Sequence, residues 1–277
     1  MKNYEELDIT DNFMFCKVFS NEEIAKDFLQ DVLKISIEKL TVVSEATAQE
    51  DPFHKSVRLD VLAKEETADT SGNLQAGRYF DIEMQMVDTG DLPKRARYYQ
   101  GMCDLDVLAK GVSYSKLQEQ YILFICPDDV FGKGKPVYRF QNRENSDPGI
   151  LLGDLCYKNF YIFSKYGEIT DETTHEYMQY FATKKCKSAK MKRIHNLVKW
   201  YRQDPATKKA YMTLEQELNI RYEKGVADGR KKGREEGREE GINTRNKELA
   251  KAFRDRGVDI DVIVSSTGLT IEEIKAL

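Results

Sequence analysis

The ten residues RYFDIEMQMV, 78–87, alternate between apolar and polar side chains. Successive side chains of an extended chain point to opposite faces, so this alternation predicts a β-strand with one apolar face. The apolar set is Phe80, Ile82, Met84 and Met86, and the opposite set is Tyr79, Asp81, Glu83 and Gln85. A strand whose one side suits a hydrophobic core therefore carries two carboxylates and an amide on its other side.

A second alternating segment, SVRLDVLA at 56–63, supplies a partner for this strand. It places Leu59, Val61 and Ala63 on one face and Asp60 on the other. The polar residues 64–77 predict a connecting loop, and the two segments together predict an antiparallel hairpin. In such a hairpin Asp60 shares a face with Glu83 and Gln85, and the last two lie about 7 Å apart.

The shared polar face has two interpretations. Carboxylates on neighbouring strands can hold Mg²⁺, which favours one or two carboxylates together with water and a substrate phosphate. The ion would activate a water molecule and stabilise charge on a phosphodiester, while Gln85 would orient the water or the phosphate. The alternative is that Asp60, Asp81, Glu83 and Gln85 form the solvated face of a half-exposed strand. For Asp81 we favour a solvated or indirect role over a ligand role.

The rest of the first half predicts helices and strands in alternation. Apolar spacing predicts two helices within 10–35, the second capped by Asn21, and a further helix over 93–111, which begins with proline and ends with glycine. Extended segments are expected at 40–49, 121–126, 137–140 and 160–163, followed by helix over 171–204. This order predicts an α/β sheet with helices on its faces.

Three basic residues at the start of the 93–111 helix lie close in sequence to the acids. Lys94, Arg95 and Arg97 could meet the phosphates of an approaching nucleic acid. The alternative is that they are ordinary basic residues on a helix surface.

The composition excludes several classes of protein. The 43 basic and 47 acidic residues argue against a simple basic nucleic-acid coat, and the five cysteines form no CxxC pair that would predict a zinc or disulfide framework. No apolar run approaches the roughly 18 residues of a membrane span, and the N-terminus does not resemble a signal peptide. We expect a cytoplasmic protein without a membrane partner.

The C-terminal part repeats glycine every fourth residue between charged residues, at 225, 229, 233, 237 and 241. Each glycine costs about 1 kcal/mol relative to alanine in a helix, so a flexible linker is one interpretation. The other is a helix whose glycine stripe allows close approach of a second copy, and hence a homo-oligomer. Residues 243–277 predict three short helices with turns at Gly257 and Gly268 and a capping box at Thr270. They fit a helix-turn-helix unit, a helical cap or an oligomerisation element.

Four segments carry a family resemblance when they are taken in order. They are TDNFMFCKVF (10–19), VRLDVLA (57–63), YFDIEMQ (79–85) and KRARYYQGMCDLDVLAKGVSYSKLQEQYILFIC (94–126). Over about 7–165 the chain resembles the Rpn family of recombination-promoting nucleases, also described as transposase-like, within the PD-(D/E)XK nuclease superfamily. The glycine and charge repeat is also similar to the tails of such proteins.

The resemblance implies a restriction-endonuclease-like core with a mixed central sheet flanked by helices, plus an all-α C-terminal appendage. It implies Mg²⁺-dependent cleavage of DNA, with the superfamily's two acids at Asp60 and Glu83 and the backbone carbonyl of Met84 as a further ligand. The superfamily lysine falls on Gln85, which departs from the general pattern, so its role could pass to Arg95 or Lys64. A further acid on the first helix could be Asp11, Glu22 or Glu23.

The resulting organisation has four parts: a nuclease-like domain at 1–170, a helical extension at 171–222, the glycine repeat at 223–242 and a helical tail at 243–277. The predicted function is a metal-dependent DNA endonuclease linked to recombination or mobile elements. One alternative is a catalytically weak or inactive DNA-binding or regulatory protein of the same fold. Another is an oligomeric interaction protein built around the glycine stripe.

Overall fold

The structure is a computed structural model that describes residues 2–48, 57–68, 74–108 and 111–277. The helical elements are η1 (Tyr4–Glu6), α1 (Asn12–Phe19), α2 (Glu22–Leu33), α3 (Leu92–Val107), η2 (Tyr114–Lys116), η3 (Phe163–Glu168), α4 (Glu172–Thr183), α5 (Ala189–Gln203), α6 (Pro205–Asp255), α7 (Ile260–Thr267) and α8 (Ile271–Ala276). The strands are β1 (Lys39–Ala48), β2 (Val57–Ala68), β3 (Leu74–Met84), β4 (Gln120–Cys126), β5 (Val137–Phe140) and β6 (Cys156–Ile162).

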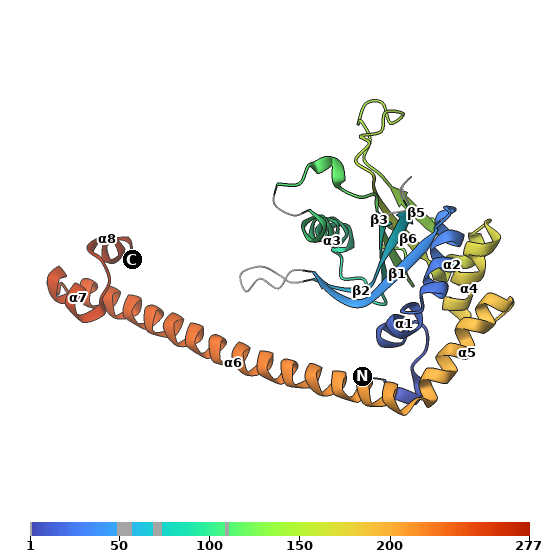
Figure 1. Ribbon diagram of the computed structural model, residues 1–277. Helices are drawn as coiled ribbons and strands as arrows, with labels where there is room; N and C mark the ends of the chain where they lie inside the picture. Colours follow the sequence, from blue (N-terminus) through green and yellow to red (C-terminus); the bar gives the residue numbers. More distant parts are fainter. Residues whose placement is uncertain (1, 49–56, 69–73, 109–110) are drawn as a thin grey trace. The chain divides into compact units, whose positions relative to one another are not determined.

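A six-stranded sheet in the order β1-β2-β3-β4-β6-β5 organises the first part of the chain (Figure 1). β1, β2 and β3 are antiparallel neighbours, β3, β4 and β6 run parallel, and β5 returns antiparallel to β6. Parallel strands are covered on both faces, which explains why β4, QYILFIC, is almost continuously apolar. The α/β class is confirmed: the sheet is mixed, helices flank it, and the fold is restriction-endonuclease-like.

The β2–β3 hairpin is longer than the sequence predicts. Residues 64–68 and 74–77 are strand rather than loop, and only 69–73 of the expected loop lie outside the described residues. The polar residues of this part are stabilised across the hairpin, because the buried Glu65 carboxylate accepts a hydrogen bond of 2.6 Å from Arg78 Nε. A Cβ at Gly77 would lie 3.1 Å from Glu65 Oε2, so glycine leaves room for this ion pair.

Helices cover both faces of the sheet. α1, α2 and α4 lie on one side, and α3 lies on the other (Figure 1). The first side contains a cluster of fully buried rings, among which Phe15 and Phe19 stack with centroids 4.3 Å apart and Phe28 packs edge-on against Phe19. Asn21 caps α2 as predicted, since its Oδ1 accepts a hydrogen bond from Ile24 N at 3.1 Å.

α3 packs on the opposite face through its apolar side. Leu92 and Ala96 are fully buried and join a cluster with β4 and β6 that includes Phe124 and Phe160. The helix ends at Val107 rather than at Gly111, because Leu108 already has extended backbone angles. Residues 109–110, the last of the predicted helix before Gly111, lie outside the described residues.

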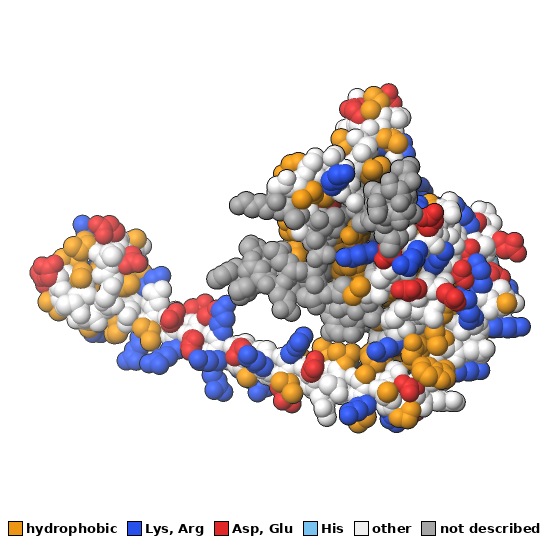
Figure 2. All heavy atoms as spheres, viewed as in Figure 1, with side chains coloured by type: hydrophobic (Ala, Val, Ile, Leu, Met, Phe, Trp, Pro, Cys, Tyr) orange, Lys and Arg blue, Asp and Glu red, His pale blue; other side chains and the backbone are white. Residues whose placement is uncertain are grey.

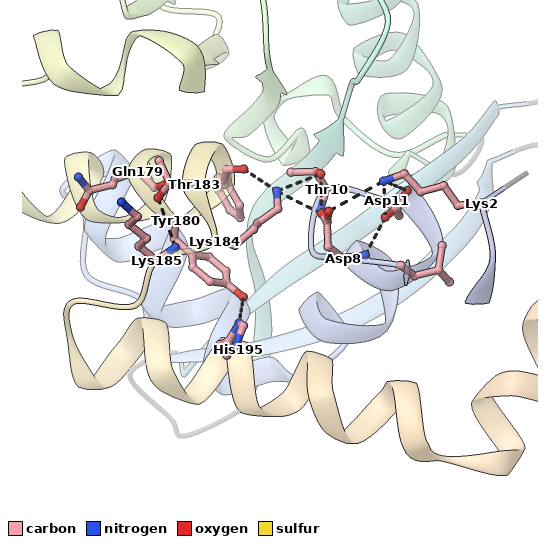
Figure 3. A network of polar contacts seen from close by, with 12 residues as sticks. Lys2, Asp8, Thr10, Asp11, Gln179, Tyr180, Thr183, Lys184, Lys185 and His195 are labelled. Atoms are coloured by element: carbon pink, nitrogen blue, oxygen red, sulfur yellow. Dashed lines mark hydrogen bonds and ion pairs between the residues drawn. The ribbon is translucent and has the colours of Figure 1, made fainter. Parts of the chain in front are cut away.

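The predicted helix over 171–204 is two helices, α4 and α5, separated at Lys184, which adopts a left-handed conformation at the end of α4. The Lys184 ammonium lies 3.1 Å from Asp8 Oδ1 and 3.1 Å from Thr10 Oγ1 in the N-terminal segment (Figure 3). Tyr180 on α4 and His195 on α5 are joined through the hydroxyl and Nδ1 at 3.4 Å. These contacts connect segments that lie far apart in the sequence.

By its internal contacts the chain forms two compact units, Met1–Tyr211 and Met212–Leu277. The division at residues 170, 222 and 242 that the sequence suggests stays a prediction. Within the second unit the glycine repeat is part of the continuous helix α6, so the linker interpretation is wrong for its secondary structure. No described helix is both long and apolar enough to cross a membrane.

The end of the second unit is a small helical cluster. Ala250 of α6 packs with Ile263 of α7, with Leu269 and with Ile274 of α8. Gly257 and Gly268 have positive φ values of 74° and 69°, and they form the two predicted turns. The Thr270 capping box is also confirmed, because its side chain and that of Glu273 each accept from the backbone N–H of the other residue.

Candidate metal-dependent active site

Asp60 on β2 and Glu83 on β3 form a reciprocal pair between the two strands. The backbone ladder ends with Val61 opposite Ile82. Beyond this point, Asp60 N donates to Glu83 Oε1 at 2.9 Å, and Met84 N donates to Asp60 Oδ2 at 3.1 Å. Each carboxylate therefore accepts a backbone N–H from the neighbouring strand, which fixes both acids on the same face of the sheet, as the hairpin predicts.

This face is not solvated. Asp81 and Glu83 are only 1% and 3% exposed, so the interpretation of a wet strand face is wrong for both residues. The reason is α3, which covers the face and which the local alternation of β3 does not reveal. Burial raises the pKa of Asp81 and of Glu83 well above the usual range, and the negative charges of the neighbouring acids, including Asp60, raise both further.

Arg95 brings a positive charge from α3 to the acids. Its Nη2 lies 3.6 Å from Glu83 Oε2, and its Nη1 donates to Gln85 Oε1 at 2.7 Å. The same guanidinium donates from Nη2 to the Tyr99 hydroxyl at 2.8 Å and packs over the Tyr99 ring, 5.3 Å from its centroid. Burial and the charge of Glu83 together raise the pKa of Tyr99 to about 12, so the phenol stays protonated at neutral pH.

Both ends of the Gln85 amide are hydrogen-bonded; the family resemblance predicts that this residue replaces the superfamily lysine. Its Oε1 accepts from Arg95, and its Nε2 donates to the Val87 carbonyl. Of the two residues expected to replace the lysine, Arg95 contacts Gln85 and Glu83, whereas the Lys64 ammonium lies 5.1 Å from the centroid of the Tyr79 ring.

Two of the basic residues predicted to contact DNA are exposed on α3. Lys94 and Arg97 are open to solvent, while Arg95, between them in the sequence, is directed towards the acids and is half-buried. A helix period of 3.6 residues separates the three in this way. Of the three residues predicted to contact DNA, Arg95 lies beside the acids, and Lys94 and Arg97 lie at the surface.

The acids suggested for the first helix contact other parts of the protein. Asp11 accepts hydrogen bonds from Lys2 Nζ and from Asp8 N at 3.0 and 2.7 Å (Figure 3). Glu23 lies 3.5 Å from Arg193 on α5, and the negative charge of Glu22 helps to raise the pKa of Lys39. An acid from the first helices at the metal site therefore stays a prediction.

The residues fit a hard divalent cation of the kind that the superfamily uses. A carboxylate offers about four acceptor positions, so Asp60 and Glu83 can each bind a cation while they accept their backbone N–H groups. Among the described residues both oxygens of the buried Asp81 lack a hydrogen-bond partner. Among the described residues no group of three or more His, Cys, Asp or Glu side chains is arranged to hold a metal ion. Remaining ligands would therefore come from the Met84 carbonyl, water and phosphate.

The contact between Tyr99 and Arg95 was not predicted from the sequence. The signal was present, because residues four apart on a helix lie on the same face and Arg95 and Tyr99 have that spacing. The burial of Asp81 had a weaker signal: its neighbours across the sheet, Leu62 and Ile122, are both apolar and come from strands on either side.

Comparison with known proteins gives one family match. Residues 9–136 match the family described as PD-(D/E)XK nuclease family transposase, and this match contains both Asp60 and Glu83. Searches of curated proteins and of solved structures gave no significant match. The matched region indicates a nuclease-like function related to mobile elements. Residues 9–136 are thus similar to the PD-(D/E)XK nuclease family transposases.

Proposed function

We propose that the protein is a Mg²⁺-dependent DNA endonuclease whose cation is held by Asp60, Glu83 and the Met84 carbonyl. The observation that carries this proposal is the reciprocal pair, in which Asp60 N donates to Glu83 Oε1 and Met84 N donates to Asp60 Oδ2. Two acids fixed on one face, beside a half-buried guanidinium, suit phosphodiester hydrolysis, because positive charge is needed where the pentavalent phosphorus gains negative charge.

Each side chain has a defined part in this mechanism. When bound, Mg²⁺ lowers the pKa of a water molecule and stabilises charge on the phosphodiester. An amide oxygen can accept two hydrogen bonds, so Gln85 can accept one from Arg95 and one from the attacking water. Arg95 supplies the positive charge that lysine supplies elsewhere in the superfamily, and its contact with Tyr99 holds it there.

Lys94 and Arg97 contact the DNA backbone in this proposal. Both are exposed on α3, the helix that also places Arg95 beside Glu83. Lysine and arginine that bind phosphates release counterions, so binding falls with salt and is largely indifferent to sequence. The family description supports cuts that serve recombination or mobile-element movement, and we expect them to be made in the cytoplasm.

A nicking assay on supercoiled plasmid tests the proposal. Wild-type protein should nick with Mg²⁺ and stop when EDTA is added, whereas Asp60→Asn should lose the activity without loss of fold. Asp104→Asn, which changes a half-buried acid bonded to Gln120, is the matched control and should keep it. Equal nicking by wild type and Asp60→Asn would contradict the proposal. DNA binding that is unaffected by metal, without any nicking, would support a non-catalytic DNA-binding protein.

We further propose that the glycine stripe of α6 mediates a parallel homodimer. Figure 2 shows both basic and acidic side chains along the exposed helix, and a Cβ at any of the five glycines would meet open space. The residues directly after the middle three glycines are basic: Arg230, Arg234 and Arg238. The residues directly before the five glycines are mixed, with three acids and two lysines: Lys224, Asp228, Lys232, Glu236 and Glu240. In a parallel pair, the positions after the glycines of one helix face the positions before the glycines of the other. The three arginines of one helix would then face a set in which acids outnumber lysines.

Sedimentation of the full-length protein tests this second proposal. A triple variant with Gly229→Leu, Gly233→Leu and Gly237→Leu would block the close approach of two α6 helices and should be a monomer. The matched triple variant with alanine at the same positions should stay a dimer and stabilise α6. A wild-type protein that is monomeric at micromolar concentration, or a triple leucine variant that is still dimeric, would contradict the dimer proposal.

A further inference from the structure

Asp81 is a buried acid that the proposed mechanism does not use. Its side chain is 1% exposed, and neither carboxylate oxygen has a hydrogen-bond partner among the described residues. Its neighbours in the sheet are Leu62 on β2 and Ile122 on β4, which are both buried and apolar. Asp81 also lies two residues before Glu83 on β3 and therefore on the same face.

A carboxylate in such surroundings destabilises the fold unless a charge compensates it. Burial of an ion without a partner is unfavourable, and a leucine or asparagine would fill the same position without burying a charge. The positive charge of Arg95 lowers the pKa of both Asp81 and Glu83. Its guanidinium, however, already contacts Glu83, Gln85 and Tyr99. Asp81 and Glu83 thus share one guanidinium, and that guanidinium makes no hydrogen bond to Asp81.

We propose that Asp81 is a positioning residue of the metal site, whose buried charge raises the affinity of Asp60 and Glu83 for a divalent cation. This inference rests on the proposed metal site. A divalent cation bound by Glu83 would supply positive charge beside the buried Asp81 carboxylate. Since the described residues include no three-residue set of metal ligands, Asp81 acts through its neighbour Glu83 rather than as a third ligand.

The expected effect is large enough to measure. Replacing a residue that supports a metal ligand from outside the ligand set commonly weakens metal affinity by about 10–100-fold. Asp81→Asn keeps the size and shape of the side chain and removes only the charge. It should therefore weaken Mg²⁺ binding while the metal-free protein melts at the same or a higher temperature than wild type, which distinguishes this role from a structural one.

Calorimetric titration of full-length protein with Mg²⁺ alone, without DNA, tests the inference. Asp81→Asn should raise the Kd by about 10–100-fold, and Asp60→Asn should abolish binding. Asp104→Asn should bind like wild type. An Asp81→Asn variant with a wild-type Kd, while Asp60→Asn has lost binding, would overturn the inference and leave the proposed function standing. A metal-free Asp81→Asn variant that melts below wild type would also overturn it, and a wild type that binds no Mg²⁺ would overturn both.

Discussion

Replacing Arg95 with methionine removes the guanidinium that connects α3 to the acids of β3 and keeps most of the apolar stem. Two hydrogen bonds from a charged donor disappear, to Gln85 Oε1 at 2.7 Å and to the Tyr99 hydroxyl at 2.8 Å. Such bonds contribute about 1.5–3 kcal/mol each when buried. Because a quarter of the Arg95 side chain is exposed, we take the lower end and expect a loss of about 3 kcal/mol.

The loss should depend on pH in a defined direction. Arg95 lowers the pKa of Glu83 against the larger effect of burial, so its removal raises that pKa further. A folded-state pKa that lies above the unfolded value makes the free energy of unfolding fall as pH rises between the two values. Arg95→Met should therefore destabilise the protein more at pH 8, where the carboxylate is forced to ionise without its partner, than at pH 5.

Urea denaturation of metal-free protein at the two pH values measures this effect. In thermal melts, about 3 kcal/mol corresponds to roughly 6–12 °C for a domain of this size. Arg97→Met is the matched control, because Arg97 is on the same helix but exposed, and it should change stability by less than about 0.5 kcal/mol. Equal losses in the two variants, or a loss for Arg95→Met that is the same at pH 5 and pH 8, would refute the reasoning.

Three further outcomes follow from the same structure. The free energy of unfolding of metal-free protein, measured by urea titration, should fall as pH rises above about 4.5. The reason is that the raised pKa values of Asp81 and Glu83 make the folded state bind protons more tightly than the unfolded state. Asp81→Asn should make this fall smaller. Asn21→Ala should cost about 1 kcal/mol of stability by removing the α2 cap, whereas Asn21→Asp should not. Lys94→Ala and Arg97→Ala should each weaken DNA binding regardless of sequence and reduce the slope of log K against log salt by about 1, measured by fluorescence anisotropy.

Most of the elements could be predicted from local patterns, because those patterns are set by burial on one face. The alternation around Ile82 and the apolar run of β4 each identify a strand, and Asn21 identifies a helix start. The hairpin also places Asp60 and Glu83 on one face, which follows from a side-chain period of two.

What failed depended on contacts between residues far apart in the sequence. Polarity at 64–77 predicted a loop, but Glu65 is neutralised by Arg78 across the hairpin, so strand pairing continues. The face of Asp81 is buried because α3 folds over it, and nothing in the alternation of β3 specifies that cover. The glycine repeat of α6 forms a helix despite weak propensity, flanked by charged residues that include the Lys232–Glu236 pair at 3.6 Å.

The account depends on one cation held between Asp60 and Glu83. Anomalous diffraction from crystals soaked in Mn²⁺, which takes the same oxygen ligands as Mg²⁺, locates that ion directly. We predict a single strong peak within about 2.0–2.5 Å of a carboxylate oxygen from each of the two residues. A peak bound elsewhere, or no peak at this pair in crystals that have taken up Mn²⁺, would contradict the account.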